Sequence, residues 1–167
     1  LSHYSDALAG YSRAIEIRER MHRNNRLLDE NNLATVYTKR AVTYHSLSRY
    51  KDALVDCARA VEIGERLRSA GKLLDENDLA AAYMTRANAY CLLTCNEDAL
   101  ADYARAVEIR ERLHWQGRLY DMNELLYCHL IKAGILAEMG DSVKEVAEYT
   151  KGITLCEELP ADKLLSV

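Results

Sequence analysis

The residues of this chain that could do metal chemistry are its 5 cysteines and 5 histidines. Cys91 and Cys95 stand four positions apart, so on a helix they would share a face and could hold a metal ion with two further ligands. No Cys or His pair elsewhere repeats at ligand spacing, and a structural zinc site needs four ligands. An odd cysteine count without framework-like spacing favours free thiols. We therefore predict no metal site, a reducing compartment and a cytoplasmic location.

Catalysis is the second chemistry to weigh. His45 and His129 could act as general bases, but neither has an evident nucleophile or orienting carboxylate at motif spacing. The chain also contains no P-loop, no GxGxxG and no HExxH motif. We expect no catalytic residue and no cofactor, which predicts that the chain is not an enzyme.

Charged residues recur at a fixed interval and could bind a ligand of opposite charge. The basic residues Arg40, Arg86 and Lys132 are spaced 46 positions apart, and so are the acidic residues Asp56, Asp102 and Glu148. The two series allow two interpretations: a row of cations that grips an acidic ligand, or an ion pair inside each helical hairpin. Pairing is favoured because a charge near a packed interface is costly without a partner.

A third charged series has the spacing of a solvent-exposed helix face. Its members are the pairs Glu16–Arg20, Glu62–Arg66 and Glu108–Arg112. A Glu four residues before an Arg modestly supports an exposed helix. We expect these pairs to form on the outer surface and to have no role in binding.

The same interval organises the whole chain. The segment YKDALVDCARAVEIGERL at residues 50–67 has close copies at 4–21 and 96–113, and a degenerate copy at 142–159. The copies begin 46 residues apart. A fixed period in this range indicates an array of stacked repeats.

Composition and hydrophobic spacing predict that the repeats are helical. With 7 Gly and 1 Pro in 167 residues, little interrupts a helix, and apolar residues recur every three or four positions. The expected helices cover residues 4–23, 32–47, 51–68, 77–94, 97–114, 123–139 and 142–159. We expect Asp29, Asn31 or Asn32 to cap the second helix. Short connections make neighbouring helices antiparallel.

The repeats resemble those of the tetratricopeptide repeat family, whose unit is two antiparallel helices, A then B. The family places a bulky residue, a small residue and Tyr in helix A, and Ala, an aromatic residue and Ala in helix B. One unit fills all six places, with Tyr83, Ala87, Tyr90, Ala99, Tyr103 and Ala106. The unit before it fills five, with Tyr37, Ala41, Tyr44, Ala53 and Ala60, and has Cys57 at the aromatic place. The unit after it is degenerate: Ala133 and Tyr149 fit, whereas His129, Leu136, Glu145 and Gly152 depart.

This resemblance implies an all-α fold, an α-solenoid of antiparallel helix pairs that winds into a right-handed superhelix. The period of 46 is longer than the family's usual period of about 34, and is similar to the long repeats of kinesin light chains and of bacterial regulatory arrays. On this basis we expect the chain to form a single array, with a partial unit at 1–26, units at about 27–72, 73–118 and 119–160, and a stub at 161–167. Because it starts partway through a unit and without Met, we expect it to be a segment of a longer protein.

In the family, the A helices line a concave face on which partner peptides lie. The residues at those places are Thr35, Thr38, Lys39, Val42 and His45; Ala81, Met84, Thr85, Asn88 and Cys91; and Tyr127, Leu130, Ile131, Gly134 and Ala137. The candidate ligand-binding residues are Thr38, Lys39, Val42, His45, Met84, Thr85, Asn88, Cys91, Tyr127, Leu130 and Ile131. The family's carboxylate-binding Lys–Asn pair is incomplete, because Met84 replaces the Lys. The apolar third set favours hydrophobic contact with a helix or extended segment.

The resemblance implies a scaffold that binds a peptide or helix of a partner protein in this groove. One alternative is a regulatory array of a larger signalling NTPase or protease that packs on its own chain. Another is self-association through the open ends of the array. The net charge of −4 argues against nucleic-acid binding, which needs a clustered basic face. No apolar run approaches the roughly 18 residues of a membrane span.

Overall fold

The structure, a computed structural model, describes residues 2–24 and 29–158. These residues form seven helices and no strand: α1 (Ser2–Arg23), α2 (Asn31–Ser46), α3 (Tyr50–Ser69), α4 (Glu76–Leu92), α5 (Asn96–Trp115), α6 (Met122–Glu138) and α7 (Ser142–Glu158). The observed bounds lie within about two residues of the predicted ones, the usual uncertainty of helix ends. Residues 25–28, the expected last residue of α7 at 159 and the stub at 161–167 lie outside the described part of the chain.

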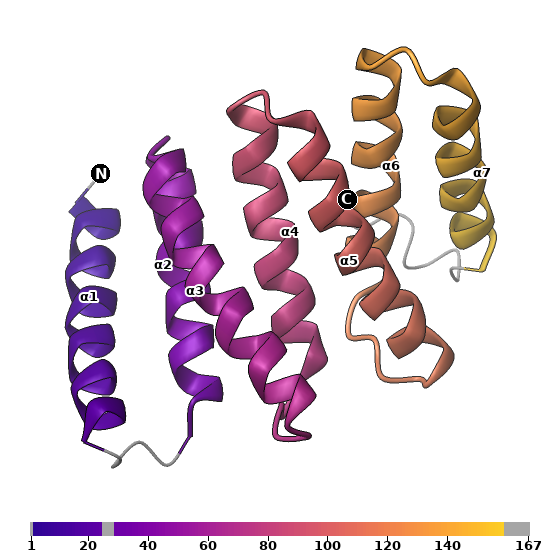
Figure 1. Ribbon diagram of the computed structural model, residues 1–167. Helices are drawn as coiled ribbons and strands as arrows, with labels where there is room; N and C mark the ends of the chain where they lie inside the picture. Colours follow the sequence, from indigo (N-terminus) through magenta and orange to yellow (C-terminus); the bar gives the residue numbers. More distant parts are fainter. Residues whose placement is uncertain (1, 25–28, 159–167) are drawn as a thin grey trace.

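The fold is all-α, and its contacts are made between neighbours in the sequence. Each helix packs against the next along the chain, and α2 also contacts α4. Figure 1 shows the helices standing in chain order, with α1 at one side and α7 at the other. Within the described residues, no helix is long and apolar enough to cross a membrane.

The turns that join α2 to α3, α4 to α5 and α6 to α7 share one geometry. Ser48, Thr94 and Gly140 occupy the left-handed region there, with φ of 57°, 57° and 77°. After each, a backbone N–H returns to a carbonyl of the preceding helix at 2.9 Å, as Arg49 does to Tyr44. A turn this short reverses the chain, so each of these helix pairs is an antiparallel hairpin.

An aspartate marks the start of each of α2, α4 and α6. Asp75 and Asp121 are the N-cap residues of α4 and α6, and their side chains accept hydrogen bonds from the backbone N–H groups of Asn77 and Asn123. Asp29 makes the same contact with the Asn31 N–H at 2.9 Å. The N-cap position of α2 is Glu30, which makes no side-chain cap bond. Of the three residues expected to cap α2, Asp29 is the one whose carboxylate accepts from a backbone N–H at the helix start.

The core depends on small residues where helices cross. The alanines at the resemblance positions are all at most 1% exposed: Ala41, Ala53, Ala60, Ala87, Ala99, Ala106 and Ala133. An Ala at a crossing lets the opposing helix approach to about 8 Å. The larger core residues, among them Tyr103, Leu113 and Leu125, are completely buried beside them.

The three expected ion pairs inside the hairpins are confirmed. Asp56 accepts two hydrogen bonds from the Arg40 guanidinium, at 2.6 and 2.7 Å. The Arg86–Asp102 pair has the same two distances, and Lys132 Nζ lies 2.9 Å from Glu148 Oε1. Because each cation is committed to an internal carboxylate, this series is not a row of free charges for an acidic ligand.

The expected pairing of the third charged series was wrong. Glu62 pairs with Arg59 one turn before it, at 2.6 Å, and Arg66 instead reaches Glu30 just before α2, at 2.5 Å. Arg112 likewise reaches Glu76 at the start of α4. These arginines tie the end of one helix to the start of its hairpin partner. A long arginine side chain can form an ion pair with a carboxylate on a neighbouring helix as readily as with one on its own helix.

Candidate functional site

The predicted groove residues differ in how far they reach the surface. Four of them are exposed: Lys39, Val42, Tyr127 and Leu130. Six are half-buried: Thr38, His45, Met84, Asn88, Cys91 and Ile131. Thr85 is buried. The Thr85 hydroxyl donates to the Ala81 carbonyl at 2.8 Å. The Thr85 hydroxyl is therefore committed to its own helix and presents no polar group to a ligand.

Side chains connect the successive helices α2, α4 and α6. The Thr35 hydroxyl on α2 donates to Asp78 on α4 at 2.9 Å. The Tyr127 hydroxyl on α6 donates to the amide oxygen of Asn88 on α4 at 3.3 Å. The three helices that should form the groove therefore lie beside one another, although they are not consecutive in the chain.

An apolar groove of about 340 Å³ lies between α4 and α6. Its lining residues are Met84, Asn123, Glu124, Leu126, Tyr127 and Leu130. Three of these, Met84, Tyr127 and Leu130, are predicted site residues, and both Tyr127 and Leu130 are more than 40% exposed. The gap between α2 and α4, which Thr38 lines, holds only about 10 Å³, the space of a single water molecule. Ligand-sized apolar space on this face is therefore found at α4 and α6.

Two tyrosines hold Asn88 next to this groove, and one of them, Tyr127, lines it. It accepts hydrogen bonds from Tyr127 and from the buried Tyr103 on α5. Burial, together with the neighbouring Tyr127, raises the pKa of Tyr103 well above its ordinary value, so its hydroxyl remains a donor. Because these donors already satisfy its amide oxygen, Asn88 offers a ligand only its amide N–H group.

Arg110 is a site residue that the sequence interpretation missed. It is 1% exposed and extends from α5 to Glu124 on α6, where Nη1 donates to the carboxylate. Its Nε and Nη2 atoms are buried without a hydrogen-bond partner among the described residues. The repeat did not single it out, since the same position holds Arg18 in the first copy and Gly64 in the second.

Gly64 and Arg110 occupy the same place in successive copies, and the helices pack differently around them. A methyl group on Gly64 would lie only 2.7 Å from the Leu79 side chain, so α3 and α4 approach closely there. The buried Arg110 side chain occupies the corresponding space between α5 and α6. Accordingly, α5 and α6 are less extensively packed than α3 and α4, and α4 and α6 less than α2 and α4. Met84 and Leu130 line the groove beside these less extensively packed helices.

The remaining predicted residues do not join this groove. His45 packs edge-on against Tyr50, with ring centroids 5.5 Å apart, and its Nε2 atom is buried without a partner among the residues described. Cys91 is half-buried, and burial raises the pKa of its thiol. Lys39 and Val42 lie on α2, away from the residues that line the groove. Any contact that they make with a ligand stays a prediction.

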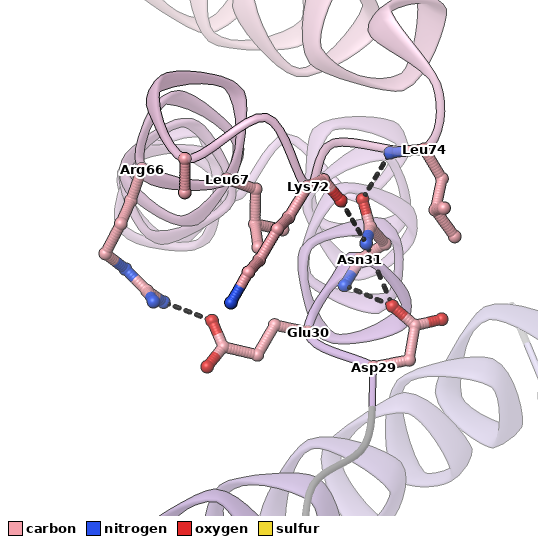
Figure 2. Close-up of a pocket in the computed structure, with 8 residues that line it drawn as sticks. Asp29, Glu30, Asn31, Arg66, Leu67, Lys72 and Leu74 are labelled. Carbon is pink, nitrogen blue, oxygen red and sulfur yellow. Dashed lines mark hydrogen bonds and ion pairs between the residues drawn. The ribbon is translucent and has the colours of Figure 1, made fainter.

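A pocket of about 610 Å³ between α2 and α3 is a structural joint (Figure 2). There Arg66 reaches across from α3 to Glu30, and the Asn31 amide accepts from the Leu74 N–H at 3.0 Å and donates to the Lys72 carbonyl at 3.2 Å. The same joint recurs one unit later, where Asn77 donates to the Arg118 carbonyl at 3.3 Å. The Glu30, Asn31 and Arg66 side chains of this pocket already bind neighbouring groups, which makes it a connection between units.

Thiols and carboxylates do not assemble into a metal site in the described residues. No group of three or more His, Cys, Asp or Glu side chains there could hold a metal ion. Burial raises the pKa of Cys57 to about 12 and that of Cys128 to about 11. These two thiols are therefore protonated at neutral pH and behave as small apolar core residues.

A buried histidine links three helices at the end of the array. His129 on α6 is 1% exposed, with Nδ1 2.7 Å from Glu148 on α7 and Nε2 3.7 Å from Glu111 on α5. Burial by itself raises the pKa of Glu148, but the hydrogen bonds from His129 and Lys132 outweigh it, and the pKa falls below 4.5. The negative form of Glu148 is thus part of the folded structure.

The stability of the folded chain at acidic pH should depend on the charges of two such carboxylates, Glu65 and Glu148. In Glu65, as in Glu148, burial raises the pKa but hydrogen bonds, here from Tyr83 and Arg68, bring it below 4.5. A pKa lowered by folding stabilises the folded chain above the unfolded pKa, and this contribution is lost as the pH falls through the folded pKa. We expect Glu65→Gln with Glu148→Gln to lower the Tm at about pH 7, with a deficit that shrinks from about pH 5 to about pH 3.

Thermal melts followed by circular dichroism would measure this deficit. Glu62→Gln is the matched control, since the Glu62 side chain is 61% exposed and should follow the parent chain throughout. A deficit that stays constant between about pH 5 and pH 3 would show that the two carboxylates do not act through their charge.

Comparison with known proteins gives no relative from which a function could be transferred: no protein-family model matches the chain, and no curated protein matches it. Its function must therefore be argued from the geometry of the groove.

Proposed function

We propose that this chain is a protein-interaction array that binds a peptide or helix of a partner protein in the groove between α4 and α6. Its helix pairs stack as a tetratricopeptide-like solenoid, with α2, α4 and α6 as the A helices on the concave side. The side-chain bonds from α2 to α4 and from α4 to α6 support this arrangement. The proposed setting is the cytoplasm, and the proposed partner is a protein, neither nucleic acid nor membrane.

The apolar groove beside Asn88 carries this proposal. Met84, Leu126 and Leu130 form its apolar lining, and Tyr127 and Glu124 add polar groups at its edge. An exposed apolar groove with a few polar groups is typical of sites that bind an amphipathic helix or an extended segment. The half-buried cations Arg40 and Arg86 have internal partners, so affinity would come from apolar contact and from the Asn88 amide N–H group.

A displayed library of random 15-residue peptides, selected against the chain, would test the proposal. We expect the selected peptides to carry apolar side chains and to bind about tenfold or more weakly to Leu130→Asp, because the charge would lie inside the groove. Leu92→Asp is the control, since Leu92 is similarly exposed on α4 but does not line the groove. Selected peptides that bind both variants equally well would contradict the groove assignment.

The two alternatives stay predictions with distinct outcomes. If the chain is a regulatory array whose groove packs on its own chain, the groove should already be occupied in a longer form of the protein. The selected peptides would then bind that longer form more weakly, because a neighbouring domain competes for the groove. Self-association would instead appear as a concentration-dependent mass in light scattering.

A further inference from the structure

A pocket of about 230 Å³ lies between α5, α6 and α7. The residues that matter below are its apolar wall and three of its polar groups: Trp115, Leu125, Leu155, Glu111, His129 and Lys151. Trp115 is 81% exposed and is the single tryptophan of the chain. Pockets for drug-sized ligands measure roughly 300–1,000 Å³, so this one suits a group of the size of a long side chain.

The first copies of the repeat contain the same pocket. It measures about 380 Å³ there and lies between α1, α2 and α3. Glu19, Leu33 and Arg59 line it at the places of Glu111, Leu125 and Lys151. This earlier pocket stays open although α4 packs on α3. The pocket is therefore a feature of the repeat unit and does not depend on which helix stands last in the array.

In the earlier copies, an arginine supplies the cation at this place. Arg105 on α5 reaches back to α3, where its Nη2 atom lies 3.4 Å from the Glu65 carboxylate. The same guanidinium pairs with Glu108 through Nη1. One unit earlier, Arg59 pairs with Glu62 at 2.6 Å. The repeat thus fills this place with a guanidinium held by carboxylates.

The copy formed by α5, α6 and α7 lacks that guanidinium. Lys151 stands at the place of Arg105, and Thr154 stands at the place of Glu108. Lys151 turns to its own helix, with Nζ 3.5 Å from Glu148 Oε1. In the part of the chain that the structure describes, no lysine or arginine pairs with Glu111, which is 45% exposed. A carboxylate of the pocket is therefore left without the cation that its counterpart Glu65 has.

The buried His129 adds a second acceptor beside this carboxylate. The pKa of Glu148 lies below its ordinary value despite burial, so at neutral pH the carboxylate is ionised and only accepts. The Nδ1 atom of His129, 2.7 Å away, must then donate to it. In the neutral imidazole the lone pair is on Nε2, which lies 3.7 Å from Glu111. These two acceptors are too far apart to bond each other, but close enough to accept from one group with several donors.

We propose that this pocket binds an alkylguanidinium group, which takes the place that Arg105 has at Glu65 in the preceding unit. The guanidinium donates to the Glu111 carboxylate and to His129 Nε2, and its planar face lies on the Trp115 ring. The pocket is separate from the groove between α4 and α6, so the proposal does not rest on that groove.

The chemistry of the pocket favours a guanidinium over an ammonium group. A guanidinium is planar and presents its donors as a fork, so it can stack on an aromatic ring and still serve two acceptors. Its alkyl chain packs on Leu125 and Leu155. Lys151 has the same sign of charge as the ligand and opposes binding, but its bond to Glu148 holds it on α7.

Trp115 gives a direct readout, because no other residue of the chain contributes tryptophan fluorescence. We expect n-butylguanidinium to change this fluorescence saturably, with a midpoint at about millimolar concentration or below. The neutral isostere n-butylurea should not bind, since it has no charge to pair with Glu111. Glu111→Gln should weaken n-butylguanidinium binding about tenfold or more. Glu108→Gln is the matched control, because Glu108 lies on the same helix, is 52% exposed and does not line the pocket.

Two changes at one position test the comparison between the copies. Lys151→Arg should weaken n-butylguanidinium binding, because an internal guanidinium then reaches Glu111 as Arg105 reaches Glu65. Lys151→Gln should strengthen binding, because it removes the like charge. Circular dichroism melts of each variant would verify that it folds as the parent chain does.

A Gly-Gly-Arg-Gly-Gly peptide distinguishes the two sources of an alkylguanidinium. Binding as tight as that of n-butylguanidinium assigns the pocket to an arginine side chain of a peptide, and weaker binding assigns it to a free small molecule. The proposal would be overturned by equal binding of n-butylguanidinium and n-butylurea, by unchanged affinity in Glu111→Gln, or by the absence of any saturable change up to about 10 mM.

Discussion

Tyr103→Ala should lower the free energy of unfolding by about 3–5 kcal/mol, the range for truncating a fully buried aromatic side chain. The Tyr103 ring is 0% exposed, and its hydroxyl donates to Asn88. Removing the ring leaves a cavity between α4, α5 and α6 that close-packed helices cannot fill. Urea unfolding followed by circular dichroism would measure the loss.

Tyr149→Ala is the matched control for this prediction, because Tyr149 occupies the same repeat position 46 residues later. Its side chain is 40% exposed, since no helix covers that face of α7 in the described residues. We expect this change to cost about 1 kcal/mol or less. Equal losses at the two positions would mean that repeat position, and not burial, sets the contribution of the tyrosine.

Asp102→Asn should cost about 3 kcal/mol, the second large effect expected in this chain. Asp102 is 6% exposed and accepts two hydrogen bonds from Arg86, at 2.6 and 2.7 Å. The guanidinium is always charged, so the isosteric Asn leaves a half-buried cation without its counter-charge. Thermal and urea unfolding would both show the loss.

Asp52→Asn is the control for charge removal as such. The Arg49–Asp52 pair has side chains about half exposed, and water compensates for its loss, so we expect less than about 1 kcal/mol. Arg86→Met combined with Asp102→Leu should recover much of the stability, because apolar residues need no partner. If Asp102→Asn proved as mild as Asp52→Asn, the internal pairs would be dispensable, and their recurrence would need another explanation.

The uniform and the variable parts of the repeat have different roles in this structure. The uniform residues, such as the buried alanines and the Arg–Asp pairs, build each hairpin and join it to the next. One place in the repeat holds Arg18, Gly64 and Arg110 in successive copies, and Arg110 lies next to the groove between α4 and α6 through its bond to Glu124. Ile153 keeps the residue type of Ile15, Val61 and Val107, so its exposure comes from the absence of a covering helix among the described residues and not from a change in the repeat.

The sequence by itself determined the helical class, the helix bounds to about two residues and the charge pairs inside each hairpin. It could do so because periodicity is local, and because a residue and its partner recur together every 46 positions. Only the tertiary structure decided that Arg66 reaches Glu30, that Arg110 reaches Glu124 and that Thr85 is buried among the groove candidates. A long basic side chain can reach carboxylates on several helices, so its partner depends on how the helices pack. The exposure of a residue likewise depends on which helix lies against it. Tyr103 and Tyr149 have the same place in the repeat, and only the presence of α6 beside the first makes one of them core and the other surface.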